Sequence, residues 1–457
     1  MELVGRTAID LAAAVRAGHA SATEVVRAHF DHLAAVEHRL GAFVTTRRRE
    51  ALAEAEAVDA ADDRDQLPLA GVPVAVKDVV DVADEPTRHG STATAGDPAA
   101  QDDEIVARLK AAGAIIIGKT RCSELSVWGT SDDHDGIAVS PWDPTRSAGG
   151  SSGGSGAAVA AGIVPLALAS DGFGSIRIPA AACGAIGMRP GAGWLPVQGA
   201  DGEPHWFGMT RYGPIATTVA DAALLLDVLA EGDTVREVAP LDTPIKAAVS
   251  WKAGAPGVVV TGAWREAALE AGRLLHHAGH TVVHEDPPYD RATIQAVVGR
   301  WTQGVGTEVA ALDLDPDQLQ PRTRAHLAAG ERLAKARPVD DADATAWRER
   351  LDPFFADHDV LITPTFARSQ PAATAWHERP WAANIASDFS TYPFCAPWNL
   401  ADLPAIVVPL WQDGGRPLSV QIVAGPGQER RALSVAAKLE ALVPRARHAP
   451  GWGVPIT

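Results

Sequence analysis

RSAGGSSGGSGAAVAAG, residues 146–162, is the stretch of this sequence that decides the fold. Four glycines and three serines fall within residues 149–155, and an alanine-rich run follows them. A flexible linker has a similar composition. This stretch, however, lies between segments that we expect to be core elements, where a floppy insert has no evident purpose. We therefore interpret it as an ordered loop that carries serine hydroxyls and leads into a helix ending near residue 162.

Apolar runs and amphipathic segments alternate on both sides of this loop. Short apolar runs predict buried strands, and recurrence at three- and four-residue spacing predicts helices. Two glycines after Asp413 predict a hairpin turn. The expected elements are a strand at 72–76, a helix at 103–112, strands at 114–117 and 163–169, a β-α-β unit from 258–261, 265–278 and 281–283, and hairpin strands at 405–410 and 418–423. This alternation predicts an α/β fold.

The ends of the chain are expected to belong to the same body. Ser21 and Glu24 have capping-box spacing, so residues 1–65 are predicted to be a helical segment packed on the core. No repeat, low-complexity tract or long linker interrupts the order of elements. Residues 1–457 are therefore expected to form a single domain.

Composition and charge limit the classes of function. The 457 residues include 40 Lys and Arg against 57 Asp and Glu, and the net charge of −17 opposes the attraction to phosphate behind most nucleic-acid binding, so no nucleic-acid partner is expected. Three cysteines are too few for a disulfide framework and fit a cytoplasmic protein. No window approaches the roughly 20 apolar residues that span a bilayer, and the N-terminus lacks the apolar core of a signal peptide. We expect no membrane association.

One motif match predicts a phosphate-binding loop and is rejected on context. Residues 113–120, GAIIIGKT, satisfy the pattern GxxxxGK[ST]. That loop must follow a strand and wrap its backbone N–H groups around phosphate, whereas here the intervening residues are themselves a β-branched strand preceded by a helix. No nucleotide site is expected there.

A second match concerns Ser152. Residues 150–154, GSSGG, fit the GxSxG elbow of α/β-hydrolases, which requires a buried strand directly before the serine. The preceding SPWDPTRSA is polar and interrupted by prolines. An esterase in which His205 or another histidine completes a Ser-His-Asp triad at Ser152 is kept as an alternative.

Three separated features fit one chemistry: Lys77 at the end of an apolar strand, Ser151 in the Gly/Ser loop and Ser175 in a second glycine-bearing loop, SDGFGSIRIP. A lysine can act as a base near neutral pH only if its pKa falls by about three units, which lies within the range for buried lysines. A neutral lysine can accept a proton from a serine hydroxyl, directly or through a second hydroxyl. Taken singly, each feature also fits a structural role: a snorkelling lysine, a linker and a helix N-cap.

In combination these residues resemble the amidase signature enzymes. GVPVAVKD (71–78), GGSSGGSGAAVAAG (149–162) and SDGFGSIRIPAAACGAIGMRP (170–190) follow that family's pattern in order and at suitable spacing. The resemblance extends to DVLITPT (359–365), to CAPWNLADLPAIVVPL (395–410) and to the N-terminal helices. Only residues 241–345 are weakly matched, and this variable part is expected to shape the substrate pocket.

The resemblance implies a fold, a reaction and roles for three residues. The implied fold is the amidase signature fold, an α/β fold whose large mixed β-sheet is covered by helices on both faces. The implied enzyme is an amidase without metal or organic cofactor. Ser175 is then the acylated nucleophile, Ser151 the bridging serine, in a cis peptide bond with Gly150, and Lys77 the base that relays protons through Ser151.

The resemblance also implies substrate-binding residues. The oxyanion is expected against backbone N–H groups of residues 172–175, which include Gly172, Phe173 and Gly174, while Arg177 is expected to brace the loop. Trp128 lies in ELSVWGTSD (124–132), a segment that lines the substrate channel in the resembled family, and it fits ordinary core packing equally well.

Phe173 departs from the family's pattern. Where the family usually reads T-D-x-G-G-S, this sequence reads Ser-Asp-Gly-Phe-Gly-Ser at 170–175. Phenylalanine would be strained if this backbone had a positive φ, and its ring is placed to project into the acyl site. We expect an unusual substrate or weak hydrolysis as its consequence.

The sequence thus predicts an amidase that hydrolyses a carboxamide C–N bond of a small molecule to a carboxylate and ammonia or an amine, and a homodimer is kept as a possible assembly. Three alternatives stay open: an amidotransferase subunit that acts on glutamyl-tRNA with partner subunits, the Ser-His-Asp esterase, and a catalytically silent amidase-like binding protein.

Overall fold

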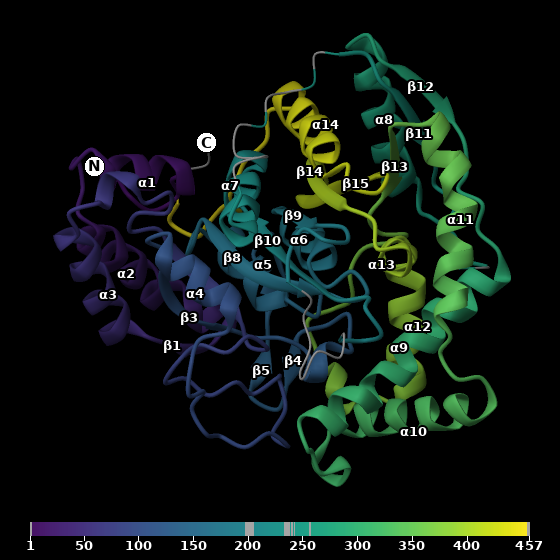
Figure 1. Cartoon of the computed structure of the whole chain (residues 1–457), viewed down its shortest axis with the longest axis horizontal. Coiled ribbons are helices and arrows are strands. Elements are labelled where there is room, and N and C mark those ends of the chain that lie inside the picture. The colour runs from purple at the N-terminus through teal and green to yellow at the C-terminus, as the bar shows by residue number, and fades with distance from the viewer. Residues whose placement is uncertain are drawn as a thin grey trace.

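A large mixed β-sheet forms the centre of the molecule (Figure 1). The computed structural model describes residues 2–196, 205–232, 238, 241, 243–255 and 257–454, and the expected domain of residues 1–457 also includes positions outside these ranges. In spatial order the 11 strands of the sheet are β1 (Phe43–Thr46), β3 (Ile115–Thr120), β2 (Pro73–Lys77), β8 (Leu166–Asp171), β10 (Arg211–Ala216), β9 (Ile186–Arg189), β14 (Ala405–Asp413), β15 (Arg416–Ala424), β13 (Val360–Pro364), β11 (Lys246–Val249) and β12 (Thr281–His284).

Parallel pairing at one side of the sheet positions the lysine. Strand β2 pairs in parallel with β3 and with β8, where Val76 lies opposite Leu168. Both β2 and β8 are buried along their whole length, as expected for strands covered on both faces. Because parallel strands end at the same edge of a sheet, Lys77 at the end of β2 lies beside Ser170 near the end of β8.

Helices cover both faces of the sheet, as the sequence predicts. Helices α5 and α6 pack on one face, and α7, α8 and α14 pack on the other. The helices are α1 (Ala8–Arg16), α2 (Ala22–Leu40), α3 (Arg48–Ala60), α4 (Glu104–Ala111), α5 (Gly153–Ala160), α6 (Arg177–Cys183), α7 (Val219–Ala230), α8 (Gly262–His277), α9 (Arg291–Ala311), α10 (Pro321–Ala336), α11 (Asp341–Asp357), α12 (Trp381–Thr391), α13 (Ala396–Ala401) and α14 (Glu429–Leu442).

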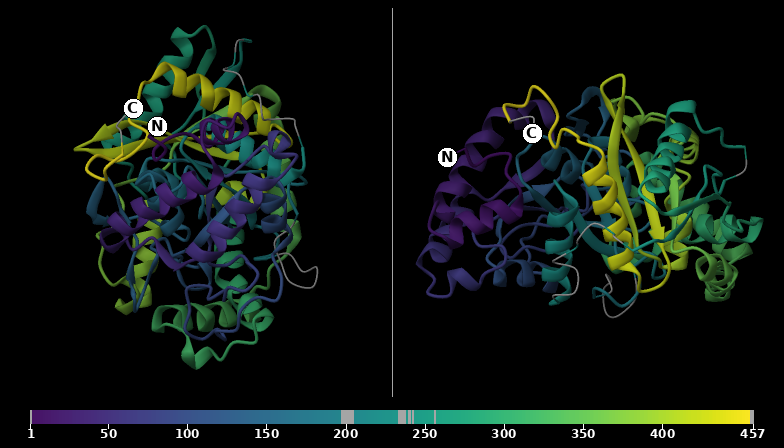
Figure 2. Two further views of the ribbon diagram at one scale, coloured as in Figure 1. Left: turned by 90° about the vertical axis from the view of Figure 1, so that its left-hand side faces the viewer. Right: turned by 90° about the horizontal axis from the view of Figure 1, so that it is seen from above.

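The N-terminal helices pack on the core, and the C-terminal segment returns to them (Figure 2). The capping box at the start of α2 is present: the side chain of Ser21 accepts the N–H of Glu24, and the side chain of Glu24 accepts the N–H of Ser21. Near the other end of the chain, the N–H of Ala449 donates to the carbonyl of Ala160 at 3.0 Å.

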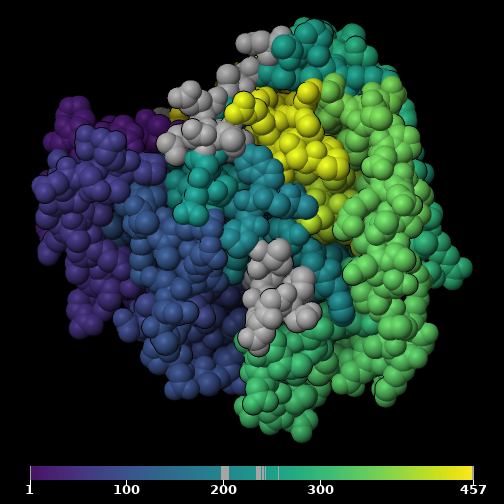
Figure 3. All heavy atoms as spheres, in the orientation of Figure 1, coloured from purple at the N-terminus to yellow at the C-terminus, as the bar shows by residue number. Residues whose placement is uncertain are grey.

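Helices α9 to α12 form a second helical layer on the side of the molecule away from the N-terminus (Figures 1 and 3). Helix α9 packs against α10, α11 and α13. Helices α9 and α10 come from the weakly matched residues 241–345, whereas α12 lies beyond them; α9 and α12 supply the walls of the main apolar pocket described below. Among the described residues, no helix is long and apolar enough to cross a membrane.

Most expected elements are present, and one strand is wrong. The hairpin of β14 and β15 turns at Gly414 and Gly415, which have φ of 56° and 80°, as a tight two-residue hairpin requires. The β-α-β unit also exists, but its first strand is β11 rather than residues 258–261. Residues 258–261 lie outside the sheet, and Val259 is 72% exposed, so the apolar β-branched run there is a surface loop.

The structure confirms the local context on which the two motif matches were rejected. Residues 115–120 of the phosphate-loop match are strand β3, buried within the sheet, and Gly113 ends the preceding helical segment with a φ of 87°. The residues before Ser152 belong to the outlying two-stranded ladder of β6 (Val139–Ser140) and β7 (Asp143–Ser147), which is separate from the main sheet, as is the ladder of β4 (Asp132–Asp133) and β5 (Gly136–Ile137).

Candidate active site

Lys77 lies in a buried cluster of serine hydroxyls. Its Nζ donates to Ser151 Oγ at 2.6 Å and to Ser170 Oγ at 3.0 Å, and its side chain is fully buried. Burial lowers the pKa of Lys77 to about 8, and the negative charge of Asp171 opposes this shift. The ammonium group is thus poised to lose its proton close to neutral pH, as the sequence argument requires.

The loop before α5 holds Ser151 in a fixed backbone geometry. The Gly150–Ser151 peptide bond is cis, as the resemblance implies. The Ser131 hydroxyl has the carbonyls of Gly149 and Ser151 within hydrogen-bond distance of its one proton, at 3.0 and 2.9 Å, and it accepts the N–H of Gly153 at 2.8 Å. Only glycine fits at position 150, because an added Cβ would lie 2.4 Å from the carbonyl oxygen of Trp128. Ser131 was not among the predicted site residues, although it lies in the segment around Trp128.

Ser175 lies beside this loop and is 6% exposed. The N–H of Ser152 donates to the carbonyl of Ser175 at 3.3 Å, which joins the two loops. Ser151 and Ser175 are both among the residues that the structure describes, and no hydrogen bond joins the Oγ of one to the Oγ of the other. The structure therefore brings Lys77, Ser151 and Ser175 into one region, with the Lys77–Ser151 contact already formed.

Buried charges brace the loop that carries Ser175. Asp171 and Arg177 are fully buried, and their side chains form a two-pronged ion pair at 2.9 and 3.0 Å. Burial alone would raise the pKa of the Asp171 carboxyl, but the Arg177 guanidinium holds it well below its usual range. Arg177 also donates to Asn399 Oδ1, Gln421 Oε1 and the carbonyl of Cys395. All its contacts are structural, in agreement with the bracing role expected for it.

The N–H groups of the loop divide into two sets. Gly174 donates its N–H to Asp171 Oδ1 at 2.6 Å, so this group is committed to the loop itself. The N–H groups of Gly172, Phe173 and Ser175 have no hydrogen-bond partner among the described residues. Unpaired N–H groups in a fixed loop are the donors that an oxyanion needs. The expectation that Gly174 also donates to the oxyanion does not agree with its bond to Asp171.

Phenylalanine is accommodated at position 173 without backbone strain. Gly174 has a φ of 121°, whereas Phe173 is not among the residues with positive φ. The condition under which Phe173 would be strained is therefore not met. Its ring stacks on the indole of Trp301 with centroids 5.0 Å apart and planes at 27°.

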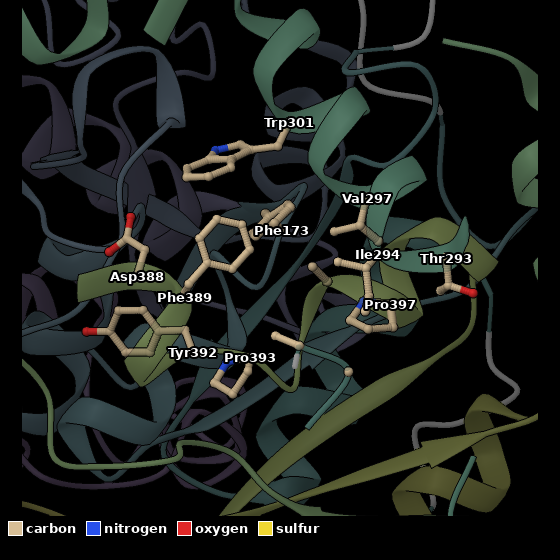
Figure 4. Close-up of a pocket in the computed structure, with 13 residues that line it drawn as sticks. Phe173, Thr293, Ile294, Val297, Trp301, Asp388, Phe389, Tyr392, Pro393 and Pro397 are labelled. Carbon is tan, nitrogen blue, oxygen red and sulfur yellow. The ribbon is translucent and has the colours of Figure 1, made fainter. Parts of the chain in front are cut away.

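This ring forms part of an apolar pocket next to the serine loops (Figure 4). Helix α9 contributes Ile294, Val297 and Trp301, and the segment of α12 and α13 contributes the facing wall. The other lining residues are Gly254, Ala255, Thr293, Asp388, Phe389, Tyr392, Pro393, Ala396 and Pro397. The wall from α9 lies in the variable residues 241–345, where the sequence places the substrate pocket in general terms; the facing wall with Asp388, Phe389 and Tyr392 lies outside that region and was not predicted.

Trp128 lies behind the pocket instead of lining it. Its side chain is 1% exposed, its Nε1 donates to Thr323 Oγ1 at 3.0 Å, and its ring meets that of Trp301 edge-on at 6.1 Å. These are the contacts of core packing, one of the two roles that its sequence position fits, and through them Trp128 supports Trp301.

His205 and Ser152 do not meet. The Ser152 hydroxyl points to the carbonyl of Ser170 at 3.4 Å. His205 is bonded to Glu308 and to Thr210, and burial lowers its pKa to about 3. The contact between a serine hydroxyl and a histidine ring that a triad of Ser152 and His205 would need is therefore missing among these bonds.

Two groups of metal-ligating side chains occur among the described residues, at 133–135 and at Glu285, Asp357 and His358. Neither includes Lys77, Ser151 or Ser175. In the first group, the Asp133 carboxylate is already paired with the Arg121 guanidinium. The serine and lysine cluster itself offers hydroxyl and amine groups rather than a ligand set for a metal ion.

Comparison with known proteins identifies similar chains along nearly the whole length. The family model described as Amidase matches residues 24–433. A relative from Mycobacterium bovis that bears the name "Putative amidase AmiB2" is 38% identical over 447 residues, covering 95% of each chain. A Rhodococcus erythropolis protein named "Acylamidase" is 31% identical over 471 residues, covering 97% of each chain. The solved structure of 6-aminohexanoate cyclic dimer hydrolase complexed with substrate superposes with a TM-score of 0.86 at 27% identity, over 98% of this chain and 99% of that one.

Proposed function

This chain belongs to the amidase family and is an amide hydrolase, and from that premise we propose that it cleaves the C–N bond of a small carboxamide through an acyl-Ser175 intermediate, with Ser151 and Lys77 relaying protons. The products are a carboxylate and ammonia or an amine. The observation that supports this mechanism best is the 2.6 Å contact between Lys77 Nζ and Ser151 Oγ inside a fully buried site.

Activation of the nucleophile depends on a neutral lysine. With a pKa of about 8, roughly one Lys77 in ten is uncharged at pH 7. The neutral amine takes the proton of the Ser151 hydroxyl, which in turn takes the proton of Ser175 as Ser175 Oγ attacks the carbonyl carbon. The relay requires a hydrogen bond between the two hydroxyls, and the backbone bond from Ser152 to Ser175 keeps both loops side by side for it.

Charge on the carbonyl oxygen is stabilised by the loop that carries the nucleophile. The N–H groups of Gly172, Phe173 and Ser175 are the available donors, and the Asp171–Arg177 ion pair keeps them in place. Donors fixed before the reaction need no reorganisation when the charge develops. When the tetrahedral intermediate collapses, Lys77 returns the proton through Ser151 to the leaving nitrogen, and the C–N bond breaks.

The acyl ester is then hydrolysed through the same relay. Water attacks the carbonyl carbon and gives its proton to Ser151, which passes it to Lys77. The Ser175 oxygen leaves and regains a proton from the relay, which restores the site. An amine or hydroxylamine can compete with water as the acceptor.

The pocket supports a small apolar amide over glutamine as the substrate. Glutamine carries an ammonium and a carboxylate, which call for charged partners of both signs, and the pocket beside the loop is lined by one acidic residue and neither lysine nor arginine. This lining disfavours an amidotransferase subunit.

Detection of the acyl-enzyme tests the proposal. Intact-mass measurement across a panel of amides and esters is expected to show an adduct of the acyl mass, and peptide mapping to place it on Ser175. Ser175→Ala is expected to abolish both adduct and turnover. An adduct on Ser152, or full turnover by Ser175→Ala, would refute the assignment of the nucleophile. The absence of any adduct or turnover in the folded wild type would favour a silent binding protein.

A further inference from the structure

One histidine and two carboxylates meet at the end of the sheet opposite to the strand that carries Lys77. Glu285 follows β12, the last strand of the sheet, while Asp357 ends helix α11 and His358 comes directly after it, before β13. Strand β11 lies between β12 and β13 and pairs with both (Figure 1). His358 Nε2 lies 3.4 Å from Glu285 Oε2 and 3.7 Å from Asp357 Oδ2. Side chains from two separate segments of the chain thus converge on one point.

The imidazole of His358 presents an electron pair to the two carboxylates. The residue is 2% exposed, and its Nδ1 lies 2.9 Å from the carbonyl oxygen of Phe354. Because a carbonyl oxygen only accepts, Nδ1 carries the proton of the neutral ring and Nε2 carries a lone pair. Nε2 is buried and has no hydrogen-bond partner among the described residues. Three electron-pair donors therefore face one another, and this arrangement favours a cation between them.

The spacing of the three groups fits a metal ion better than a proton. A protonated Nε2 would donate to a carboxylate at about 2.7–2.9 Å, which is shorter than either contact. Zn²⁺ binds nitrogen and oxygen at about 2.0–2.2 Å, so two of its ligands at the tetrahedral angle lie about 3.3–3.6 Å apart. The contact of His358 to Glu285 has this length, and the contact to Asp357 is close to it. A bond from Nδ1–H to a backbone carbonyl is also the usual support of a histidine that binds a metal through Nε2.

Both carboxylates have oxygens that can bind an ion. Glu285 is 51% exposed at its side chain, and its only ion pair within the described part of the chain is the one with His358. Lys246 Nζ donates to Asp357 Oδ2 at 2.6 Å, whereas Asp357 Oδ1 has no hydrogen-bond partner among the described residues. The adjacent Asp359 is committed to the N–H of Lys246 and to the guanidinium of Arg431. One lysine beside two open carboxylates leaves a net negative charge around Nε2, which attracts a cation.

We propose that Glu285, Asp357 and His358 bind Zn²⁺, with water as the fourth ligand. A site that includes an imidazole nitrogen suits Zn²⁺ better than Ca²⁺ or Mg²⁺, which take oxygen ligands. The ion joins the edge strand β12 to the junction of α11 and β13. Because it binds the folded chain through two segments, it stabilises the fold, and it does so apart from the serine and lysine cluster.

Zinc titration of the full chain tests this site. With protein that carries no histidine tag and has been freed of metal by a chelator, calorimetric titration with ZnCl₂ is expected to show binding at one ion per chain. A Zn²⁺ concentration 100 times the Kd is expected to raise the melting temperature by about 2–3 °C. His358→Gln is expected to weaken binding at least about tenfold and to remove this shift, since loss of even a supporting hydrogen bond has that effect on a metal site.

Glu285→Gln is the second variant. It changes an exposed side chain, so it keeps the test decisive where His358→Gln fails to fold. Zinc affinity is expected to fall at least about tenfold here too, because the carboxamide has lost the negative charge of the ligand.

His134→Gln is the matched control. His134 belongs to the other group of metal-ligating side chains, at 133–135, where the Asp133 carboxylate is already paired with Arg121. Zinc affinity and the shift in melting temperature are expected to stay as in wild type. Absence of zinc binding in the folded wild type would show that His358 and the two carboxylates form an ion pair only, and would overturn the proposal. Equal affinity in wild type and Glu285→Gln, or loss of binding in His134→Gln alone, would overturn it as well.

Discussion

Lys77 Nζ lies 2.6 Å from Ser151 Oγ although the two residues are 74 positions apart in the chain. The contact joins the end of β2 to the cis loop before α5. The other hydrogen bond of the amine goes to the hydroxyl of Ser170 at 3.0 Å. The pKa of this amine therefore affects both the rate of the reaction and the free energy of unfolding.

The rate of acylation should rise with pH through about 8. Burial lowers the pKa of Lys77 to about 8, and only the neutral amine can accept a proton. A profile of kcat/KM against pH for a neutral amide is expected to show a single ascending limb with its midpoint near that value. Lys77→Arg should be inactive throughout, because arginine keeps its charge. A flat profile between pH 6 and pH 10 would contradict a lysine base.

Lys77→Met should inactivate the enzyme and stabilise the fold. The pKa of Lys77 falls from its ordinary 10.5 to about 8 on folding, so at neutral pH the folded state bears a cost of about 3 kcal/mol. Between these two values the unfolded state binds more protons, and the free energy of unfolding rises with pH. Urea denaturation at pH 7 is expected to show Lys77→Met as more stable than wild type, with the gap narrowing toward pH 10. A gap that does not depend on pH would argue against a charged buried lysine.

Ser151→Ala and Ser152→Ala should differ sharply. Loss of a positioned proton relay costs about 10²- to 10⁴-fold in kcat, and this is expected for Ser151→Ala. Ser152 Oγ makes only a 3.4 Å contact with the carbonyl of Ser170, so Ser152→Ala should keep kcat close to that of wild type. Steady-state kinetics on one amide checks both variants. The reverse order of effects would restore the GxSxG interpretation.

The catalytic cluster was predictable because its parts are local. Lys77 ends an apolar strand, and Ser151 and Ser175 lie in loops whose glycines are visible in the sequence. The strand predicted at residues 258–261 was wrong, because its local signal does not say whether the segment is buried in the sheet. Its β-branched residues mark extended backbone but not burial, and the true strand β11 reads KAAV, with two alanines that give a weak strand signal.

The pocket could not be predicted, because tertiary structure alone assembles it. Asp388 meets Gly129 across 259 positions of the chain, and Phe173 meets Trp301 across 128. Neither α9 nor α12 carries a motif that marks these residues. The role of Trp128 was undecided for a similar reason, since a tryptophan next to a channel and one behind its wall have the same sequence signal.

Arg177→Met should cost more stability than any surface arginine. The side chain of Arg177 is fully buried against Asp171, and removing one partner of such a pair leaves an uncompensated charge at a cost of about 3–5 kcal/mol. Thermal or urea denaturation measures the loss. Arg332→Met on the exposed face of α10 is the matched control and should be near neutral. Equal stability of the two variants would show that the loop does not depend on the ion pair.

Gly174→Ala should damage both the fold and the reaction. Gly174 has a φ of 121°, and an added Cβ would lie 2.6 Å from Cys395 Cβ and 2.9 Å from Ile178 Cδ1. Backbone strain of this kind costs about 1–3 kcal/mol, and relief by movement of the loop would displace Ser175 and the unpaired N–H groups beside it. We expect a lower free energy of unfolding and a fall in kcat that exceeds any change in KM. Gly18→Ala is the control that distinguishes the cost of a positive φ from the cost of a steric clash. Gly18 also has a positive φ, 69°, but an added Cβ there meets nothing within 4 Å. A Gly174→Ala variant with wild-type kcat would show that the exact position of this loop does not limit the rate.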